Sequence, residues 1–234
     1  MTVSRSVLLL THVAHEGPGL ISRALDGVPV TARTVVDDPA PHLPPLEALA
    51  GVVVMGGPQD ADDERGHPGL AAERRLLSEA VDADVPVLGV CLGMQILALA
   101  LGARLHRRHG TEVGFLPVDV VAGDPVLAPA GPRPVVLHWH DDAVDLPAGA
   151  TLLASTLTTP VQAFRAGSGI GIQFHLEMEE PLLDLWLGTP AMTSGLEPGQ
   201  SNAMRLESRQ HLGALRPAAA LGFAAFGDAV RARA

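Results

Sequence analysis

Aromatic residues and clusters of basic residues are scarce in this sequence of 234 residues. Only 3% of the residues are aromatic and tyrosine is absent, so the usual platforms for stacking nucleic-acid bases are missing. The formal net charge is −10, and basic residues form no run longer than a pair such as Arg107-Arg108, which disfavours binding to a phosphate backbone. We therefore expect no nucleic-acid partner.

Long hydrophobic runs are missing near the N-terminus, and cysteine occurs once. The apolar run at residues 7–10 is too short for a secretory signal or a membrane span. A single cysteine, Cys91, excludes an intrachain disulfide and fits a reducing compartment where a thiol stays free. These features predict a cytoplasmic protein without a membrane partner, and the 47% hydrophobic content is ample for a core.

Short β-rich runs alternate with helical patterns along the chain, an order typical of α/β proteins. In the first half, strands are expected at residues 7–10, 30–36, 52–55 and 85–90, and helices at 19–25, 70–81 and 95–101. After Gly102 the pattern changes to β segments at 118–121, 134–138, 151–155, 161–165 and 169–174. We predict an α/β fold with a mainly parallel central sheet flanked by helices and a β-rich second half.

The last part of the chain has a helical pattern with one interruption. Residues 188–200 are rich in Gly, Pro, Ser and Thr, so a loop is expected there, between helices at 182–187 and 202–212. Phe223, Phe226 and Val230 recur on one face of a terminal helix. We expect one domain over residues 1–187 and a helical C-terminal extension, residues 188–234, packed on the same domain.

The only cysteine lies between two glycines at the end of an apolar run. The segment Gly-Val-Cys-Leu-Gly-Met-Gln at residues 89–95 predicts a strand, a sharp turn and the start of a helix. At such a turn, backbone N–H groups and the helix dipole can stabilise a thiolate, which is the geometry of a nucleophile elbow. An isolated cysteine is more often a buried structural residue. The flanking pattern favours Cys91 as a nucleophile.

Acyl transfer from an amide also needs a base and a group that orients the base. His175 follows the strand expected at 169–174 and can act as base and then as acid. In an extended chain Glu177 shares a face with His175 and can hold the proton on its far nitrogen. An isolated His-x-Glu pair is usually a solvated surface feature. Its position after a buried strand favours the catalytic interpretation.

Further candidate residues surround this nucleophile. Gly56-Gly57 follows the strand at 52–55 and is either a plain turn or a source of oxyanion donors, with the N–H groups of Gly57 and Leu92 directed at the oxyanion. Gln95 lies one helical turn beyond Cys91, so its amide can face the same pocket unless it is a surface glutamine.

The histidine-rich segment His-Trp-His-Asp-Asp at residues 138–142 invites a metal interpretation. No second ligand motif such as His-Glu-x-x-His accompanies it. We therefore expect neither a metal nor another cofactor.

Four segments together resemble the class I, or triad, glutamine amidotransferases. They are the nucleophile motif at 89–95, Met-Gly-Gly-Pro at 55–58, the histidine segment at 138–142 and Gln-Phe-His-Leu-Glu at 173–177, in the order that the family shows. The nearest likeness is to free-standing members similar to the glutaminase domain of GMP synthase. The resemblance covers roughly residues 7–187 and implies a flavodoxin-like fold.

The resemblance also implies roles for particular residues. It implies a triad of Cys91, His175 and Glu177, an oxyanion hole from the backbone of Gly57 and Leu92, and substrate contacts from Gly56, Gln95, His140, Asp141 and Asp142. Asp141 departs from the Gly or Ser that is common after this histidine, which puts the shape of the substrate pocket in doubt. Segments at 15–19 and 111–114 match the same subgroup, but the sequence assigns no role to His15, Glu16 or Glu112.

The expected reaction is hydrolysis of the γ-amide of glutamine through a γ-glutamyl thioester, with release of glutamate and ammonia. The sequence contains no Walker-type loop or other nucleotide-binding segment, so the ammonia would serve a separate synthetase partner. Two alternatives stay open: a hydrolase of γ-glutamyl peptides or conjugates, and a catalytically silent regulatory subunit.

Overall fold

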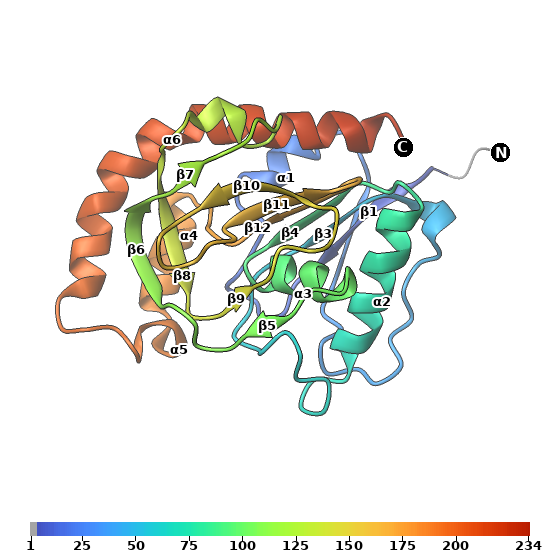
Figure 1. Cartoon of the computed structure of the whole chain (residues 1–234), viewed down its shortest axis with the longest axis horizontal. Helices are drawn as coiled ribbons and strands as arrows, with labels where there is room; N and C mark the ends of the chain where they lie inside the picture. Colours follow the sequence, from blue (N-terminus) through green and yellow to red (C-terminus); the bar gives the residue numbers. More distant parts are fainter. Residues whose placement is uncertain (1–3) are drawn as a thin grey trace.

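An eight-stranded sheet forms the centre of the protein (Figure 1), whose computed structural model describes residues 4–234. The strand order is β2-β1-β3-β4-β12-β11-β10-β7. The first five strands are parallel: β2 (Val30–Arg33), β1 (Ser6–Leu10), β3 (Leu49–Val54), β4 (Val87–Val90) and β12 (Gly169–Ile172). The antiparallel strands β11 (Ala163–Ala166), β10 (Thr151–Ser155) and β7 (Asp119–Val120) complete the sheet. The predicted fold class is confirmed.

Helices cover both faces of the sheet. On one face lie α2 (Gly69–Asp82) and α3 (Leu92–Ala100), and on the other lie α1 (Ile21–Ala24) and α6 (Gln200–Arg231), which runs along the upper and left border of the view in Figure 1. Along β1 the side chains alternate between the two cores, with Leu8 packed in one and Leu9 in the other. This two-sided burial explains why the central strands are continuous apolar runs in the sequence.

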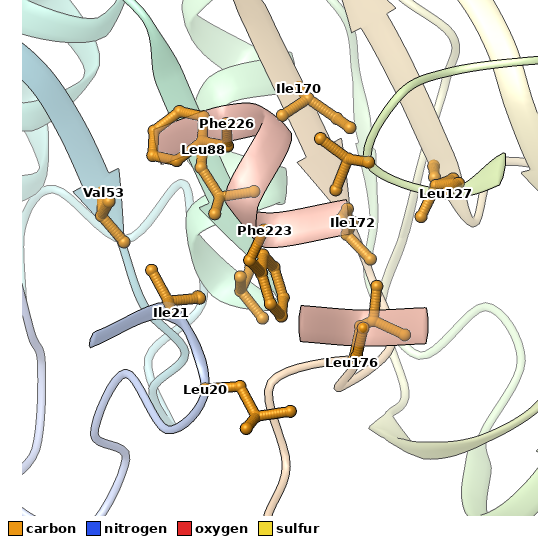
Figure 2. Close-up of a cluster of buried hydrophobic side chains, with 14 of the residues drawn as sticks. Leu20, Ile21, Val53, Leu88, Leu127, Ile170, Ile172, Leu176, Phe223 and Phe226 are labelled. Atoms are coloured by element: carbon orange, nitrogen blue, oxygen red, sulfur yellow. The ribbon is translucent and has the colours of Figure 1, made fainter. Parts of the chain in front are cut away.

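The core beneath α6 contains aromatic side chains from the helix itself. Phe223 and Phe226 lie among Leu88, Ile170 and Ile172 of the sheet (Figure 2). The predicted stripe on the terminal helix therefore packs against the sheet. No helix within residues 4–234 combines the length and apolar character that crossing a membrane requires.

Smaller elements surround the sheet. Two antiparallel pairs join β5 (Leu105–His106) to β9 (Ala143–Val144) and β6 (Glu112–Pro117) to β8 (Val135–His140). The 3-10 helices η1 (Leu46–Ala48) and η2 (Ala128–Ala130) and the helices α4 (Glu180–Gly188) and α5 (Pro190–Thr193) complete the chain. The backbone hydrogen bond from His175 N to Leu137 O, 2.8 Å long, joins the β6–β8 pair to the end of β12.

Several expectations about elements were wrong in extent. The helix expected at 19–25 is the single turn α1, and the strand expected at 30–36 ends at Arg33. The segment 188–200 contains the short helix α5 and is not entirely loop. The two helices expected after residue 202 are one helix of 32 residues with Pro217 inside it. A proline removes only one helical hydrogen bond, and packing of the buried face keeps the helix continuous.

Candidate functional site

Cys91 lies at a tight turn between β4 and α3, at the carboxyl edge of the sheet. Its φ of 53° is in the left-handed region, which is uncommon for a residue with a side chain and marks a strained turn. Both flanking glycines are required by close backbone approach: an added Cβ would lie 2.5 Å from Gly93 O at Gly89 and 2.1 Å from Val54 O at Gly93. The turn is therefore fixed by its surroundings and is not adaptable.

His175 and Glu177 form a buried pair just beyond β12. His175 Nδ1 lies 2.8 Å from Glu177 Oε1, and both side chains are 1% exposed. Burial alone would lower the pKa of His175, but the charge of Glu177 and the neighbouring Cys91 side chain raise this pKa well above its ordinary value. Within residues 4–234 the other ring nitrogen, Nε2, has no hydrogen-bond partner. That nitrogen is available for a proton transfer.

Adjacent parallel strands bring the two groups to one place. β4 and β12 pair in parallel, with Val90 beside Ile172, so the residues that follow the two strands meet at the same edge. Cys91 and His175 both line a cavity of about 290 Å³. The Cys91 thiol lies 3.9 Å from the carbonyl oxygen of Trp139, which also lines the cavity.

Most of the residues proposed from the sequence line this cavity. These are Gly57, Cys91, Leu92, Gln95, His140, Asp141, Asp142 and His175. Glu177 is buried behind His175, and Gly56 lies next to Cys91, since a Cβ added to Gly56 would lie 3.5 Å from Cys91 Cβ. The structure thus gathers the predicted residues around one cavity.

A buried ion pair behind the Gly56-Gly57 turn was not expected from the sequence. His12 follows β1; its Nδ1 lies 2.9 Å from Gly56 O and its Nε2 lies 3.1 Å from Glu73 Oε2. On α2 the side chain of Glu73 is fully buried, while that of the next residue, Arg74, is half-buried. The pairing with His12 explains the burial of Glu73. A histidine two residues after an apolar strand was the available signal.

Another polar network holds the histidine segment. Glu112 Oε2 accepts a 2.6 Å hydrogen bond from Gln162 and lies 3.3 Å from His140 Nε2. Burial would raise the pKa of Glu112, but hydrogen bonds that include His140 and Thr156 lower it overall. Glu112 therefore supports the cavity wall from behind, a position the sequence did not reveal. Gln95 is also held, because its Nε2 donates to Gln173 Oε1 at 3.1 Å.

Glu112 and His140 of this network, together with His138, could hold a metal ion. Ligand atoms of Glu112, His138 and His140 lie within 4.8 Å of one another, and all three residues are buried. Burial lowers the pKa of His138 to about 4, so its ring is neutral at physiological pH and has a lone pair to offer. The carboxylate of Glu112 is already engaged by Gln162 and His140.

The segment 15–19 contacts the His175–Glu177 pair. Glu177 O accepts a 3.0 Å hydrogen bond from Leu20 N, and a Cβ on Gly19, whose φ is +47°, would lie 2.2 Å from the same oxygen. His15 O accepts a 2.8 Å hydrogen bond from Trp186, whose ring meets His175 edge to face. The segment therefore fixes the backbone and the ring environment of the pair.

Glu16 from the same segment lines the cavity although it is only 5% exposed. Burial raises the pKa of Glu16, while the nearby His175 and His12 oppose this rise. Within the described part of the chain no cation forms an ion pair with its carboxylate, and no group donates a hydrogen bond to it. The sequence alone assigned no role to Glu16.

Comparison with known families identifies related proteins. The family profile described as "Glutamine amidotransferase class-I" matches residues 21–182. A glutamine amidotransferase-like protein of Salmonella typhimurium, YfeJ, is 34% identical over 143 residues, which are 58% of this chain and 60% of YfeJ. One subunit of the glutamine-hydrolyzing GMP synthase of Sulfolobus acidocaldarius is 32% identical over 160 residues, which are 66% of this chain and 78% of that subunit.

The matched segment spans less than two thirds of YfeJ and only 24% of the GMP synthase of Thermomicrobium roseum, to which it is 34% identical. Among solved structures, a glutamine amidotransferase from Thermotoga maritima superposes with a TM-score of 0.87 at 25% identity, covering 96% of this chain and 99% of the other. A structure from Methylobacillus flagellatus, at 23% identity and a TM-score of 0.85, shares the fold.

Proposed function

This chain belongs to the class I glutamine amidotransferase family, and from that premise we propose that it hydrolyses the γ-amide of glutamine to glutamate and ammonia. One observation supports the proposal above all. The buried pair of His175 and Glu177 borders the same cavity as Cys91, and the Nε2 atom of His175 is free for proton transfer.

In the proposed reaction Cys91 Sγ attacks the γ-carbonyl carbon while the thiol proton passes to His175 Nε2. The carbonyl oxygen becomes an oxyanion that accepts hydrogen bonds from the N–H groups of Gly57 and Leu92. The C–N bond then breaks, and ammonia leaves with the proton from His175, which gives a γ-glutamyl thioester. Water, deprotonated by His175, attacks the thioester to release glutamate and regenerate the thiol. Glu177 accepts a hydrogen bond from Nδ1–H throughout, which keeps the ring oriented and stabilises the imidazolium.

The remaining cavity residues are proposed to bind the substrate. The amide of Gln95 is fixed by Gln173 and faces the cavity, and the segment from His140 to Asp142 forms the facing wall, braced from behind by Glu112. Asp141 and Asp142 offer carboxylates that suit the α-ammonium group of glutamine, and Gly56 closes the turn beside Cys91. No metal or other cofactor takes part in the proposed reaction.

We further propose that the ammonia serves a separate synthetase protein. The likeness to one subunit of a glutamine-hydrolyzing GMP synthase supports this proposal. Stimulation of glutamine hydrolysis by such a partner is the expected sign.

A second candidate is hydrolysis of γ-glutamyl peptides or conjugates by the same thioester chemistry. The apolar wall formed by Trp139, Trp186 and Met192 favours it, because these side chains can pack against a leaving amine larger than ammonia. Turnover of a panel of γ-glutamyl amines that exceeds turnover of glutamine would make this candidate the better one.

The test measures glutamate and ammonia released from L-glutamine by the wild type and by two variants. We expect Cys91→Ala to be inactive and Glu177→Gln to lose roughly 10³- to 10⁴-fold in kcat, because glutamine would present a donor to Nδ1 and stabilise the wrong tautomer of His175. Thermal unfolding of each variant serves as the folding control. Glutamine turnover that survives in Cys91→Ala would overturn the proposal, and inactivity of the wild type towards every compound would indicate a silent regulatory subunit.

A further inference from the structure

His12 is a buried histidine that the proposed reaction does not use. Its ring lies between Gly56 O, 2.9 Å from Nδ1, and Glu73 Oε2, 3.1 Å from Nε2, and the side chains of His12 and Glu73 are fully buried. We infer that His12, held by Glu73, is a positioning residue that orients the Gly56-Gly57 peptide so that the Gly57 N–H faces the oxyanion. The inference rests on the proposed function.

The two contacts determine where the protons of the pair lie. A carbonyl oxygen can only accept, so Nδ1 carries a proton and donates it to Gly56 O. One further proton is shared between Nε2 and Glu73. Burial alone would lower the pKa of His12, but Glu73 and Gly56 raise it overall, which favours the protonated form of the ring. The hydrogen bond to Gly56 is therefore charge-assisted and stronger than one from a neutral ring.

The orientation of Gly56 O determines the orientation of the next N–H. In a planar trans peptide the C=O and the N–H point in opposite directions. Because Gly56 O points to His12, the Gly57 N–H points away from His12, and Gly57 borders the cavity together with Leu92 and Cys91. The same amide is polarised by the bond to its oxygen, which makes its N–H a better donor.

A Gly-Gly pair needs such an external constraint. Glycine has little conformational preference of its own, so the peptide between Gly56 and Gly57 is free to rotate unless something outside it fixes its oxygen. No side chain can be added there instead: a Cβ on Gly57 would lie 2.6 Å from His12 Cβ and 2.9 Å from Leu92 Cδ2. The turn is thus too compact for a side chain, and the donor on His12 selects one orientation of the Gly56-Gly57 peptide.

Substitutions of His12 separate the contact with Gly56 from the contact with Glu73. In His12→Asn the amide nitrogen takes the place of Nδ1 and keeps a donor for Gly56 O. In His12→Gln it takes the place of Nε2 and keeps only the contact with Glu73. Loss of an oxyanion donor typically costs about a hundredfold or more in rate. We expect kcat to fall about 100-fold in His12→Gln and His12→Leu with little change in KM, and less than 10-fold in His12→Asn.

Alkylation of Cys91 by iodoacetamide is the matched readout, because this reaction needs a reactive thiolate but no oxyanion hole. We expect every folded His12 variant to be alkylated at a rate within threefold of the wild type. Glu73→Gln keeps a partner for His12 Nε2 but removes the charge, so its kcat should fall less than that of His12→Leu. It provides a second variant if His12→Leu does not fold.

Three results would overturn the inference. The first is a wild-type kcat in folded His12→Gln, and the second is an equal loss of kcat in His12→Asn and His12→Gln. The third is a fall in the alkylation rate of Cys91 that parallels the fall in kcat. Failure of the proposed function is recognised separately, because then the wild type itself does not hydrolyse glutamine while Cys91 is still alkylated, and the inference fails with its premise.

Discussion

Glu16 is a carboxylate buried without a cation of its own in the cavity that Cys91 and His175 line. Burial of a charged group without a partner is costly, so the ionised form of Glu16 destabilises the folded state. Cys91 also destabilises the folded state, because its backbone stays in the left-handed region, which is unfavourable for a residue with a side chain. Both costs fall at the proposed active site, which is where a trade of stability for activity is expected.

Replacing Glu16 by glutamine should therefore stabilise the protein in a pH-dependent way. The raised pKa means that folded Glu16 holds its proton at a pH where the unfolded chain has lost it. Stability is consequently lost as pH rises from 4.5, the ordinary value, through the folded pKa, and glutamine avoids this loss. We expect the Tm of Glu16→Gln to exceed that of the wild type by an amount that grows as the pH rises from 4.5 through the folded pKa of Glu16.

The control for this experiment is Glu207→Gln, at an exposed position of α6, which should shift the Tm little at any pH. A Tm difference for Glu16→Gln that is constant with pH, or that shrinks at high pH, would contradict the inference that the ionised form of Glu16 destabilises the folded state.

The role of a single residue could be predicted from the sequence where its immediate neighbours in the chain indicate it. Cys91 was noticed through its flanking glycines, and His175 and Glu177 through the strand before them. His12 and Glu73 were not predicted as a pair, because they are 61 positions apart and each becomes interpretable only when the other is beside it. A buried charge is visible in a sequence only as an interruption of an apolar pattern.

At the scale of elements, α6 approaches its neighbours closely at two of its glycines, Gly222 and Gly227. A Cβ on Gly222 would lie 2.0 Å from Val126 O, and one on Gly227 would lie 2.1 Å from Ala24 O. Both contacts are with backbone, which cannot rotate away as a side chain can. These glycines set the distance between α6 and its neighbours.

Gly222→Ala should accordingly destabilise the protein by about 1–3 kcal/mol, the range for overpacking a tight contact. Gly213→Ala on the same helix meets nothing within 4 Å, and there alanine should stabilise by about 0.5–1 kcal/mol through its helix propensity. Urea unfolding of the two variants measures both free energies. Equal changes in the free energy of unfolding at the two positions would show that the close approach of α6 at Gly222 does not affect stability.

Elements buried on both sides were predicted well, and elements at the periphery less well. The strands β1, β3, β4 and β12 are continuous apolar runs, so their sequences alone indicate them. β6 was missed because Gly114, with φ +125°, and Pro117 interrupt its pattern. The continuity of α6 through Pro217 depends on tertiary packing, which local propensity does not contain.

For the whole molecule, the segment after residue 187 shares its core with the sheet. Leu215, Phe223, Phe226 and Val230 belong to the same buried cluster as residues of β1, β3 and β12. We therefore expect the extension proposed from the sequence, residues 188–234, to stay bound when the chain is cut.

A protease site inserted after Gly195, which is exposed between α5 and α6, tests this expectation. After cleavage the two pieces should elute together in gel filtration and separate only in urea. Elution of two separate species in native buffer would mean that the extension is held mainly by its covalent connection.

The pairing of β4 with β12 has a consequence for the order in which the protein is made. Cys91 follows the first strand of this pair and His175 follows the second, with most of the β-rich half of the chain between them. During synthesis the thiol therefore emerges long before the imidazole proposed to activate it, because the strand pairing that brings them together joins residues such as Val87 and Gly169, which are 82 positions apart. If the proposed triad is correct, a growing chain carries a cysteine without its base, and the proposed amide hydrolysis becomes possible only when β12 has paired with β4.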